Sequence, residues 1–440
     1  MNEQDRIPVT KVQRSAKILQ TGVKVGINYL KHYSRKAVDP SLPSENLDRQ
    51  NAADVFDSLS ELKGSALKVA QMLSLDRQIL PKAYAEKFAF AQYNAPPLSG
   101  PLIVRTFTRY FGKPPHEIFD AFDLKAAAAA SIGQVHRATL HGKPLAVKIQ
   151  YPGVAESITS DLRLIKPFAL RLFDISGRDL DAYLAEVQER VLEETDYTLE
   201  LKRSIRFAEA CADLEHIAFP AYYPELSCNR VITMDWLEGR HLQAFLSTNP
   251  PAVARNQVGQ ALWDFYNFQQ HELRAVHADP HPGNFLVLPD GRVGVLDFGC
   301  IKEIPEEFYE AFFSLTQPDF TEDQARAFSA FERLGLILAT DPPVRREFYF
   351  RHYLEIIRLF ARPFLEEAFD FSDANFFSSM YEYGERISRL PEFKKPRGSR
   401  HFIYMNRTNF GLYNILHQLG ARVRTDRFRP QLQPLCNGLV

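Results

Sequence analysis

The chain has 440 residues, of which 45% are hydrophobic and 24% charged, with a formal net charge of −1. This length exceeds a single core of roughly 250–300 residues and predicts two or three. The near-neutral charge gives no argument for nucleic-acid binding. Four cysteines without CxxC spacing exclude a recognisable zinc site and favour a reducing, cytoplasmic compartment. No apolar stretch approaches the ~18 residues of a membrane-spanning helix, so a soluble or peripheral protein is expected.

The first 36 residues are basic, with eight Lys or Arg and two acidic residues. Apolar residues recur there at steps of three and four, which predicts an amphipathic helix over 8–36. Its apolar stripe consists of Val12, Ala16, Leu19, Val23, Ile27 and Leu30. The favoured interpretation is a helix that packs this stripe on the main domain. The alternative is a helix that lies on an anionic membrane surface.

Further elements follow in chain order. A Pro-rich linker at 40–51 precedes a predicted helix over 52–74, and another helix is expected over 104–111. The alternating pattern from 118 to 150, with a turn at 141–143, predicts a β-hairpin. Residues 154–210 are helical by period, 228–237 form a strand, and helices continue to about 420 after a Pro/Gly-rich stretch.

Two motifs near residue 280 carry the chemistry of phosphoryl transfer. His277-x-Asp279 is followed five residues later by Asn284, and Asp297-Phe298-Gly299 follows across a predicted hairpin. This is the spacing of the kinase catalytic and magnesium-binding motifs. We expect Asp279 to orient the acceptor, and Asn284 and Asp297 to bind Mg²⁺, or Mn²⁺ in its place, through oxygen atoms.

A lysine before these motifs completes the expected set. Lys148 ends the strand 145–148 and is expected to contact the nucleotide phosphates. Its partner should be a glutamate on a following helix, and Glu200 is the chosen candidate. Glu194 and Asp196 also lie in the helix predicted over 180–210. Asp196 and Glu200 are four apart and would share a face.

The nucleotide-binding segments depart from the kinase pattern. An alanine run replaces the glycine-rich loop, and alanine lacks glycine's access to positive φ. A nucleotide-facing role is favoured over an extra helical turn. No Ala-Pro-Glu follows Gly299, so the segment that seats a peptide substrate is expected to be absent. The expected nucleotide-binding residues are Ala128, Ala129, Ala130, Ser131, Ile132, Gly133, Lys148 and the linker Met234, Asp235, Trp236 and Leu237.

The chain resembles the UbiB/aarF-domain family of atypical kinases, which includes the coenzyme Q kinase-like proteins. The motifs that carry the resemblance are Leu62–Ser74, Ala127–His136, Glu194–Tyr197 and His277–Asn284. The resemblance implies that Lys68 and Gln71 form the family's Lys-x-x-Gln signature on a helix that covers the active site, held in part by Glu194 and Asp196. Ala70 stands where the family usually has glycine. Ubiquinone or other isoprenoid-lipid metabolism, ATPase activity and membrane surfaces are implied as well.

These features predict an α+β, bilobal protein-kinase-like fold. Its parts are an N-terminal helical extension (1–117), an N-lobe with a helical insertion (118–236) and a mostly helical C-lobe (237–440). We expect an atypical kinase or ATPase that binds ATP or ADP with Mg²⁺ between the lobes and does not phosphorylate proteins. A non-catalytic, nucleotide-gated lipid- or partner-binding pseudokinase and a small-molecule phosphotransferase are the alternatives. An anionic membrane surface or isoprenoid lipid could contact the N-terminal helices at the inner membrane face, and a homodimer stays open.

Overall fold

The computed structural model describes residues 11–36, 45–62, 97–129, 132–172, 177–393 and 397–427. These residues form two compact units, the first made of 1–202 and 221–236 and the second of 203–220 and 237–440. Both combine helices with sheets, as expected for an α+β fold. None of the helices in the described ranges is long and apolar enough to cross a bilayer. Lys68, Gln71, Ala130 and Ser131 lie outside the described residues.

The first unit contains a five-stranded antiparallel sheet. Its path is β1-β3-β4-β6, with β2 paired to β3. His141 and Gly142 join β3 to β4 with φ of 52° and 75°, the backbone of the two-residue hairpin turn that the sequence predicts. The strands are β1 (Ala121–Phe122), β2 (Ala128–Ala129), β3 (Gly133–Leu140), β4 (Lys143–Gln150) and β6 (Val231–Asp235).

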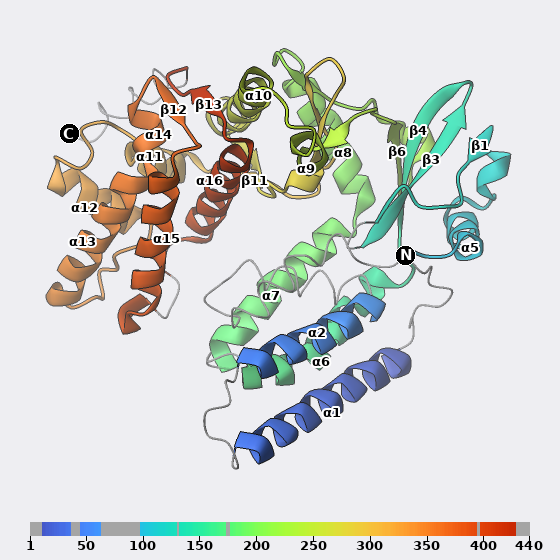
Figure 1. Cartoon of the computed structure of the whole chain (residues 1–440), viewed down its shortest axis with the longest axis horizontal. Helices are drawn as coiled ribbons and strands as arrows, with labels where there is room; N and C mark the ends of the chain where they lie inside the picture. Colours follow the sequence, from blue (N-terminus) through green and yellow to red (C-terminus); the bar gives the residue numbers. More distant parts are fainter. Residues whose placement is uncertain are drawn as a thin grey trace. The chain divides into compact units, whose positions relative to one another are not determined.

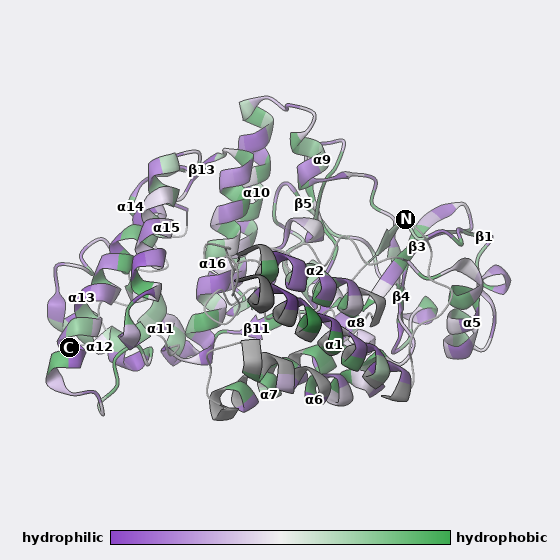
Figure 2. Cartoon of the chain, turned by 60° about the horizontal axis from the view of Figure 1, so that its bottom comes forward, coloured by the Kyte–Doolittle hydropathy of each residue, from purple (hydrophilic) through white to green (hydrophobic). Residues whose placement is uncertain are grey.

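Helices make up the rest of the first unit. In Figures 1 and 2, α1, α2, α6 and α7 lie side by side, and residue contacts join α1 to α2 and to α6, and α6 to α7. The helices are α1 (Lys11–Lys36), α2 (Glu45–Leu62), α5 (Gly100–Phe111), α6 (Val154–Leu172), α7 (Gly177–Glu194) and α8 (Tyr197–Ala210), with short 3-10 turns at Pro115–Glu117 and Pro224–Leu226.

Helix α1 packs through a different face from the one its sequence favoured. Arg14, Thr21 and Val25 are buried. The Arg14 guanidinium donates to both carboxylate oxygens of Asp161 on α6, at 2.7 and 2.5 Å. The expected stripe faces away, because Leu19, Val23 and Ile27 are 68%, 56% and 44% exposed. At 100° per residue the two sets lie on opposite sides of the helix. The helix packs on its neighbours, but its apolar stripe does not.

The second unit is mostly helical around one large aromatic core. Buried residues of this core come from α10, α11, α13 and α16 among others, and Figure 2 shows hydrophobic residues interleaved with hydrophilic ones along α10 and α16. The helices are the last part of α8, α9 (Leu242–Leu246), α10 (Ala252–His271), α11 (Glu306–Ser314), α12 (Gln324–Arg333), α13 (Pro343–Phe360), α14 (Arg362–Leu365), α15 (Ala374–Ser388) and α16 (Arg400–Leu419), with 3-10 turns at Pro282–Asn284 and Pro391–Phe393.

Three small sheets position the loops of the second unit. One has the order β5-β10-β9-β7, in which β5 runs parallel to β10, and the pairs β8–β11 and β12–β13 are antiparallel. The strands are β5 (Ile217–Ala218), β7 (Arg240–His241), β8 (Ala275–His277), β9 (Phe285–Val287), β10 (Val293–Val295), β11 (Ile301–Glu303), β12 (Ala368–Asp370) and β13 (Arg422–Arg424). The hairpin β9–β10 and the pair β8–β11 bring both phosphoryl-transfer motifs into this unit.

Candidate functional site

Lys148 and Glu200 form a buried ion pair in the first unit. The Nζ of Lys148 lies 2.5 Å from Oε1 of Glu200, and the two residues are only 8% and 6% exposed. Lys148 also lies over the ring of Tyr197, 5.0 Å from its centroid. Sheet register places Lys148 opposite Val135 and Ile232, so these side chains share one face of the sheet. The lysine is therefore held at a fixed position by a glutamate from α8.

The joint between α7 and α8 sets the position of that glutamate. The sequence predicted one helix through Glu194, Asp196 and Glu200, but the helix breaks at residues 195–196. Asp196 precedes α8, and its Oδ1 accepts from the backbone N–H groups of Thr198 and Leu199. It acts as the N-cap of α8 and does not share a helical face with Glu200, so that expectation was wrong. The half-buried Glu194 ends α7.

The side chains that hold this joint are ones that sequence reasoning missed. Gln150 and Arg230 both donate to the carbonyl oxygen of Thr195, at 3.0 and 2.7 Å. The ring of Tyr197 is fully buried below Lys148. The Asp196 cap could have been found, since aspartate just before a helix is a typical start signal.

The alanine run forms a strand rather than an extra helical turn. Ala128 and Ala129 pair with Val135 and Gln134 of β3. Ile132 is buried, and its carbonyl accepts from the N–H of Tyr151 at 2.9 Å. At Gly133 a Cβ would lie 2.6 Å from the carbonyl oxygen of Ile149, so this position accepts only glycine without a shift. The segment that contains the alanine run is thus bonded to neighbouring strands both before and after the two undescribed residues.

Met234 and Asp235, the first two residues of the predicted linker, are the last two residues of β6 and lie on opposite faces of the sheet. Met234 is two residues from Ile232, so its buried side chain lies on the Lys148 face of the sheet. Asp235 lies on the opposite face, where its Oδ1 is 2.8 Å from the Nζ of Lys143. The hydroxyl of Tyr223 donates to the same carboxylate at 2.7 Å. Although burial opposes it, hydrogen bonds from Lys143 and Tyr223 lower the pKa of Asp235. Its side chain is therefore committed to this network.

The last two linker residues have different surroundings. The guanidinium of Arg137 lies over the ring of Trp236, 5.1 Å from the ring centroid. Leu237 belongs to the second unit, where it packs in a small cluster with Leu286 and Leu288.

The second unit brings Asp279, Asn284 and Asp297 together. The N–H of Leu296 donates to the carbonyl of Asn284 at 3.0 Å, so Asn284 and Asp297 flank the two ends of the β9–β10 hairpin. The Nδ2 of Asn284 donates to the carbonyl of Asp279 at 3.0 Å and lies 3.4 Å from its carboxylate. These bonds hold the His277–Asn284 loop closed over the hairpin.

The donor set fits a magnesium ion. Because the amide nitrogen of Asn284 binds Asp279, its amide oxygen is left for a cation. The Oδ1 of Asp297 accepts from the N–H of Gly299 at 2.7 Å, which orients that carboxylate. No group of three His, Cys, Asp or Glu able to hold a metal occurs in the described parts of the chain. Mg²⁺ in nucleotide sites takes one or two protein carboxylates and completes its shell with phosphate oxygens and water.

Buried aromatic residues lie beneath these polar groups. Phe298 is fully buried, and its ring centroid lies 5.6 to 5.8 Å from those of Phe207, Phe219 and His277. His277 is also fully buried. Burial lowers the pKa of His277, although Asp279 and Asp297 act in the opposite direction. The ring is therefore neutral at physiological pH. Because Phe298 is packed among these rings, it fixes the backbone position of the adjacent Asp297.

The chain after Gly299 enters regular structure at once. β11 pairs with β8 so that Ile301 lies opposite His277. The N–H of Ile304 donates to the carbonyl of Arg274 at 2.7 Å, and Pro305 is the N-cap of α11. Only residues 300–305 separate Gly299 from this helix. Strand pairing therefore occupies this segment.

Comparisons with known proteins give the family of the chain. A family model described as the ABC1 atypical kinase-like domain matches residues 91–330. An ABC1 family protein of Schizosaccharomyces pombe is 28% identical over 73% of this chain and 62% of its own length. The mitochondrial atypical kinase coq-8 of Caenorhabditis elegans is 28% identical over 68% of this chain and 41% of its own length. The chain thus spans about half the length of these curated relatives.

A solved structure covers more of the chain. The complex of Rv3197 with erythromycin, from Mycobacterium tuberculosis, is 26% identical and has a TM-score of 0.59. The match covers 90% of this chain and 97% of the mycobacterial one.

Proposed function

Because the chain belongs to the ABC1 atypical kinase-like family, we propose that it binds Mg·ATP or Mg·ADP and transfers or releases the terminal phosphoryl group of ATP. The buried ion pair between Lys148 and Glu200 carries this proposal. A lysine is rarely buried unless it is paired, and a strand lysine held by a helical glutamate binds phosphate oxygens in kinases.

Each polar group has a part in the proposed reaction. Lys148 would bind the α- and β-phosphates, and Asn284 and Asp297 would hold the magnesium ion, which neutralises charge on the phosphates. Asp279 would orient the attacking hydroxyl group or water. Met234 and the β2–β3 segment from Ala128 to Gly133 would contact the nucleotide, whereas Asp235 would contribute only its backbone. The short connection after Gly299 leaves no platform for a peptide, which favours a small molecule or water as acceptor and argues against protein phosphorylation.

Replacement of Asp297 tests the proposal. Purified Asp297→Asn should lose Mg²⁺-dependent phosphate release by a factor of at least about 100 while its thermal unfolding stays close to that of the wild type. Asp290→Asn is the matched control, because Asp290 is exposed at the tip of the same hairpin. Equal turnover in Asp297→Asn and wild type would refute the assignment. A wild type that binds nucleotide without turnover would favour the pseudokinase alternative. Phosphorylated product from an added alcohol would identify a small-molecule phosphotransferase.

The exposed stripe on α1 supports a second part of the proposal, a peripheral location on anionic membranes. Residues 11–36 hold seven Lys or Arg and no acidic residue. Leu19, Val23 and Ile27 form an exposed apolar row beside the basic side chains Lys31 and Lys24, of which Lys24 is paired with Asp54 of α2 at 2.8 Å. Apolar and cationic side chains in this arrangement suit the surface of an anionic bilayer. The proposed link to isoprenoid-lipid metabolism, including ubiquinone, is supported by the resemblance to the coenzyme Q kinase-like proteins.

Vesicle binding tests the membrane proposal. The full chain should co-sediment with phosphatidylglycerol vesicles and not with phosphatidylcholine vesicles, and it should dissociate at high salt. The triple variant Leu19→Gln/Val23→Gln/Ile27→Gln should lose this binding. Val253→Gln/Val344→Gln is the control, since these residues are equally apolar and more exposed, in the other unit. Equal binding by the two variants would exclude α1 as the contact. Phosphate release measured with and without phosphatidylglycerol vesicles then shows whether binding alters turnover.

A further inference from the structure

A glycine on α16 lies directly against the His277–Asn284 loop. A Cβ atom built on Gly411 would lie 2.3 Å from Cγ of Pro280, 3.2 Å from its Cβ and 3.4 Å from its carbonyl oxygen. Pro280 follows Asp279 in the chain. The ring of Pro280 therefore occupies the space that any other residue at position 411 would need, and the loop rests on the bare backbone of the helix.

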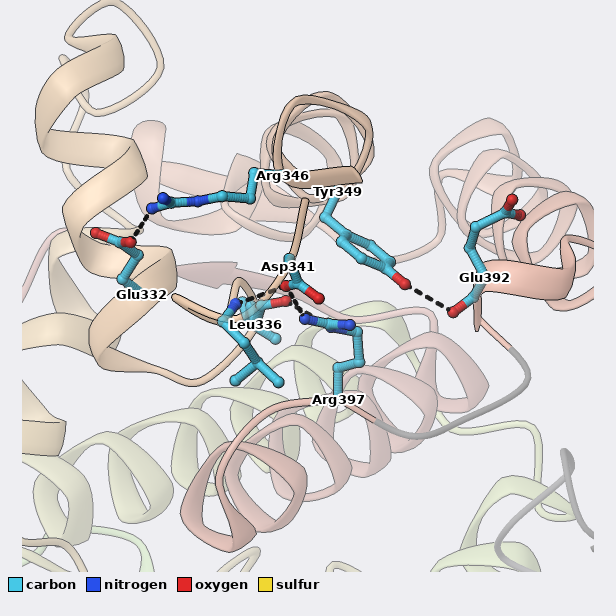
Figure 3. Close-up of polar contacts among 8 residues, drawn as sticks. Glu332, Leu336, Asp341, Arg346, Tyr349, Glu392 and Arg397 are labelled. Carbon is cyan, nitrogen blue, oxygen red and sulfur yellow. Dashed lines mark hydrogen bonds and ion pairs between the residues drawn. The ribbon is translucent and has the colours of Figure 1, made fainter. Parts of the chain in front are cut away.

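The helix that carries Gly411 is anchored at its beginning. Figure 3 shows Arg397 pointing toward Leu336 and Asp341. Its Nε donates to the carbonyl of Leu336 at 2.9 Å, its Nη2 pairs with the Asp341 carboxylate, and its guanidinium lies 3.9 Å from the ring centroid of Tyr349. The N–H of Ser399 donates to the carbonyl of Leu334 at 2.8 Å. Arginine, aspartate and backbone thus tie the start of α16 to the turn between α12 and α13.

The middle and the end of α16 are fixed as well. The Nε2 of Gln270 on α10 donates to Oδ1 of Asn409 at 3.1 Å, in the buried interface. At the other end, Arg255 donates to the carbonyl of Leu419 at 3.0 Å, and Gly420 ends the helix with φ of 55°. Leu412 and Leu416 are buried on the same helix. Because α16 is held at its start, middle and end, a steric clash at Gly411 displaces α16 less than it displaces the His277–Asn284 loop, which is held by a few hydrogen bonds.

From these contacts we propose that Gly411 is a positioning residue for Asp279. An added methyl group needs at least about 1 Å more separation from Pro280 to reach ordinary van der Waals contact. Because α16 is anchored, the displacement falls on the loop and moves the Asp279 carboxylate relative to Asn284. A misplacement of about 1 Å at a reacting centre can lower the rate by a factor of about 100. This inference rests on the proposed function only for its catalytic consequence.

Gly384 provides a matched control, because it is also a helical glycine of the second unit. It lies in α15, and a Cβ built on it meets nothing within 4 Å. Gly411→Ala should lower kcat for phosphate release by about 100-fold and change KM for ATP by less than about threefold. Gly384→Ala should leave both values unchanged. The double variant Gly411→Ala/Pro280→Ala removes the ring atom nearest to the new methyl group, and it should recover at least tenfold of the lost kcat.

Hydrogen exchange keeps the inference testable if the wild type turns over no ATP. The N–H groups of His277 and Ala278 donate to Gln269 and to the carbonyl of Cys300, both at 2.8 Å. Gly411→Ala should speed exchange across 277–284 by at least tenfold, and Gly384→Ala should not. An unchanged exchange rate, or a kcat within threefold of the wild type, would overturn the role of Gly411. A wild type without turnover but with faster exchange in Gly411→Ala would refute the proposed function alone.

Discussion

Replacing Glu200 by glutamine tests the energetics of the ion pair on which the proposed function depends. The substitution keeps the shape of the side chain but removes the charge 2.5 Å from the Lys148 ammonium. Lys148 is 8% exposed, so its charge would remain in the interior without its partner carboxylate. Breaking one side of a buried pair costs about 3–5 kcal/mol, because the remaining ion keeps its desolvation penalty.

An exposed pair shows what the same chemical change costs in water. Glu385 on α15 and Arg389, the C-cap residue of that helix, form an i,i+4 pair at 2.6 Å, but their side chains are 68% and 75% exposed. Such pairs contribute at most about 1 kcal/mol. Glu385→Gln should therefore lower the free energy of unfolding by less than about 1 kcal/mol, although the bond lengths of the two pairs are nearly the same.

Urea denaturation of the full chain measures the difference. With a slope of about 2 kcal/mol/M, Glu200→Gln should lower the midpoint of the first unit by roughly 1.5–2.5 M, and Glu385→Gln should change the second unit by less than about 0.5 M. The double variant Lys148→Met/Glu200→Leu should regain most of the stability, because apolar residues often replace a buried ion pair without loss. It should still fail to bind nucleotide. Equal costs for Glu200→Gln and Glu385→Gln would refute the reasoning.

Two further predictions concern other buried groups. Asp161→Asn removes the partner of the buried Arg14 guanidinium, which costs about 3–5 kcal/mol, and should therefore speed tryptic cleavage within 11–36 by at least about 100-fold. The control is Asp181→Asn, which breaks an exposed pair. Equal cleavage rates in the two variants would contradict the prediction. Burial, with a smaller contribution from a nearby arginine, lowers the pKa of His271 to about 3. The unfolded chain takes up this proton below about pH 6.5 and the folded chain only near pH 3, so stability should fall as pH drops through that range. The pH profile of unfolding should be flatter in His271→Gln, and an unchanged profile would count against this origin.

The sequence predicted those parts of the site in which local chemistry determines structure. The hairpin ending at Lys148 follows from alternation and from a turn whose residues adopt positive φ. The loop from His277 to Asn284 follows from its prolines and glycine, which exclude a helix interior. The pairing of Lys148 with Glu200 needed more than local chemistry. The prediction of this pair depends on the order of motifs along the chain, which matches that of protein kinases. Local chemistry does not reach that far, because the two residues are 52 positions apart.

Periodicity alone failed where tertiary contacts override it. The apolar stripe of α1 predicted burial of Leu19 and Val23. The opposite face is buried instead, because the guanidinium of Arg14 pairs there with a buried carboxylate, Asp161 on α6. A buried charged hydrogen-bonded pair can orient a helix against its hydrophobic pattern when a suitable partner exists, and that partner lies 147 residues away. At Asp196 the period continued through a helix break, because an acidic residue fits a helix surface and a cap equally well.

Gly384 and Gly411, which both lie in helices of the second unit, show why such contacts do not follow from local sequence. By helix propensity alone, a glycine in a helix interior costs about 1 kcal/mol relative to alanine. At Gly384 nothing lies where a side chain would be, so alanine there should raise stability by about that amount. At Gly411 the same gain is opposed by the ring of Pro280, which is 131 positions earlier in the chain. If Gly411→Ala raises the melting temperature as much as Gly384→Ala and hydrogen exchange across 277–284 is unchanged, then the close contact with Pro280 has no mechanical consequence. A smaller rise in melting temperature for Gly411→Ala than for Gly384→Ala, together with a loss of turnover, would instead show that the new methyl group strains the contact between α16 and the His277–Asn284 loop.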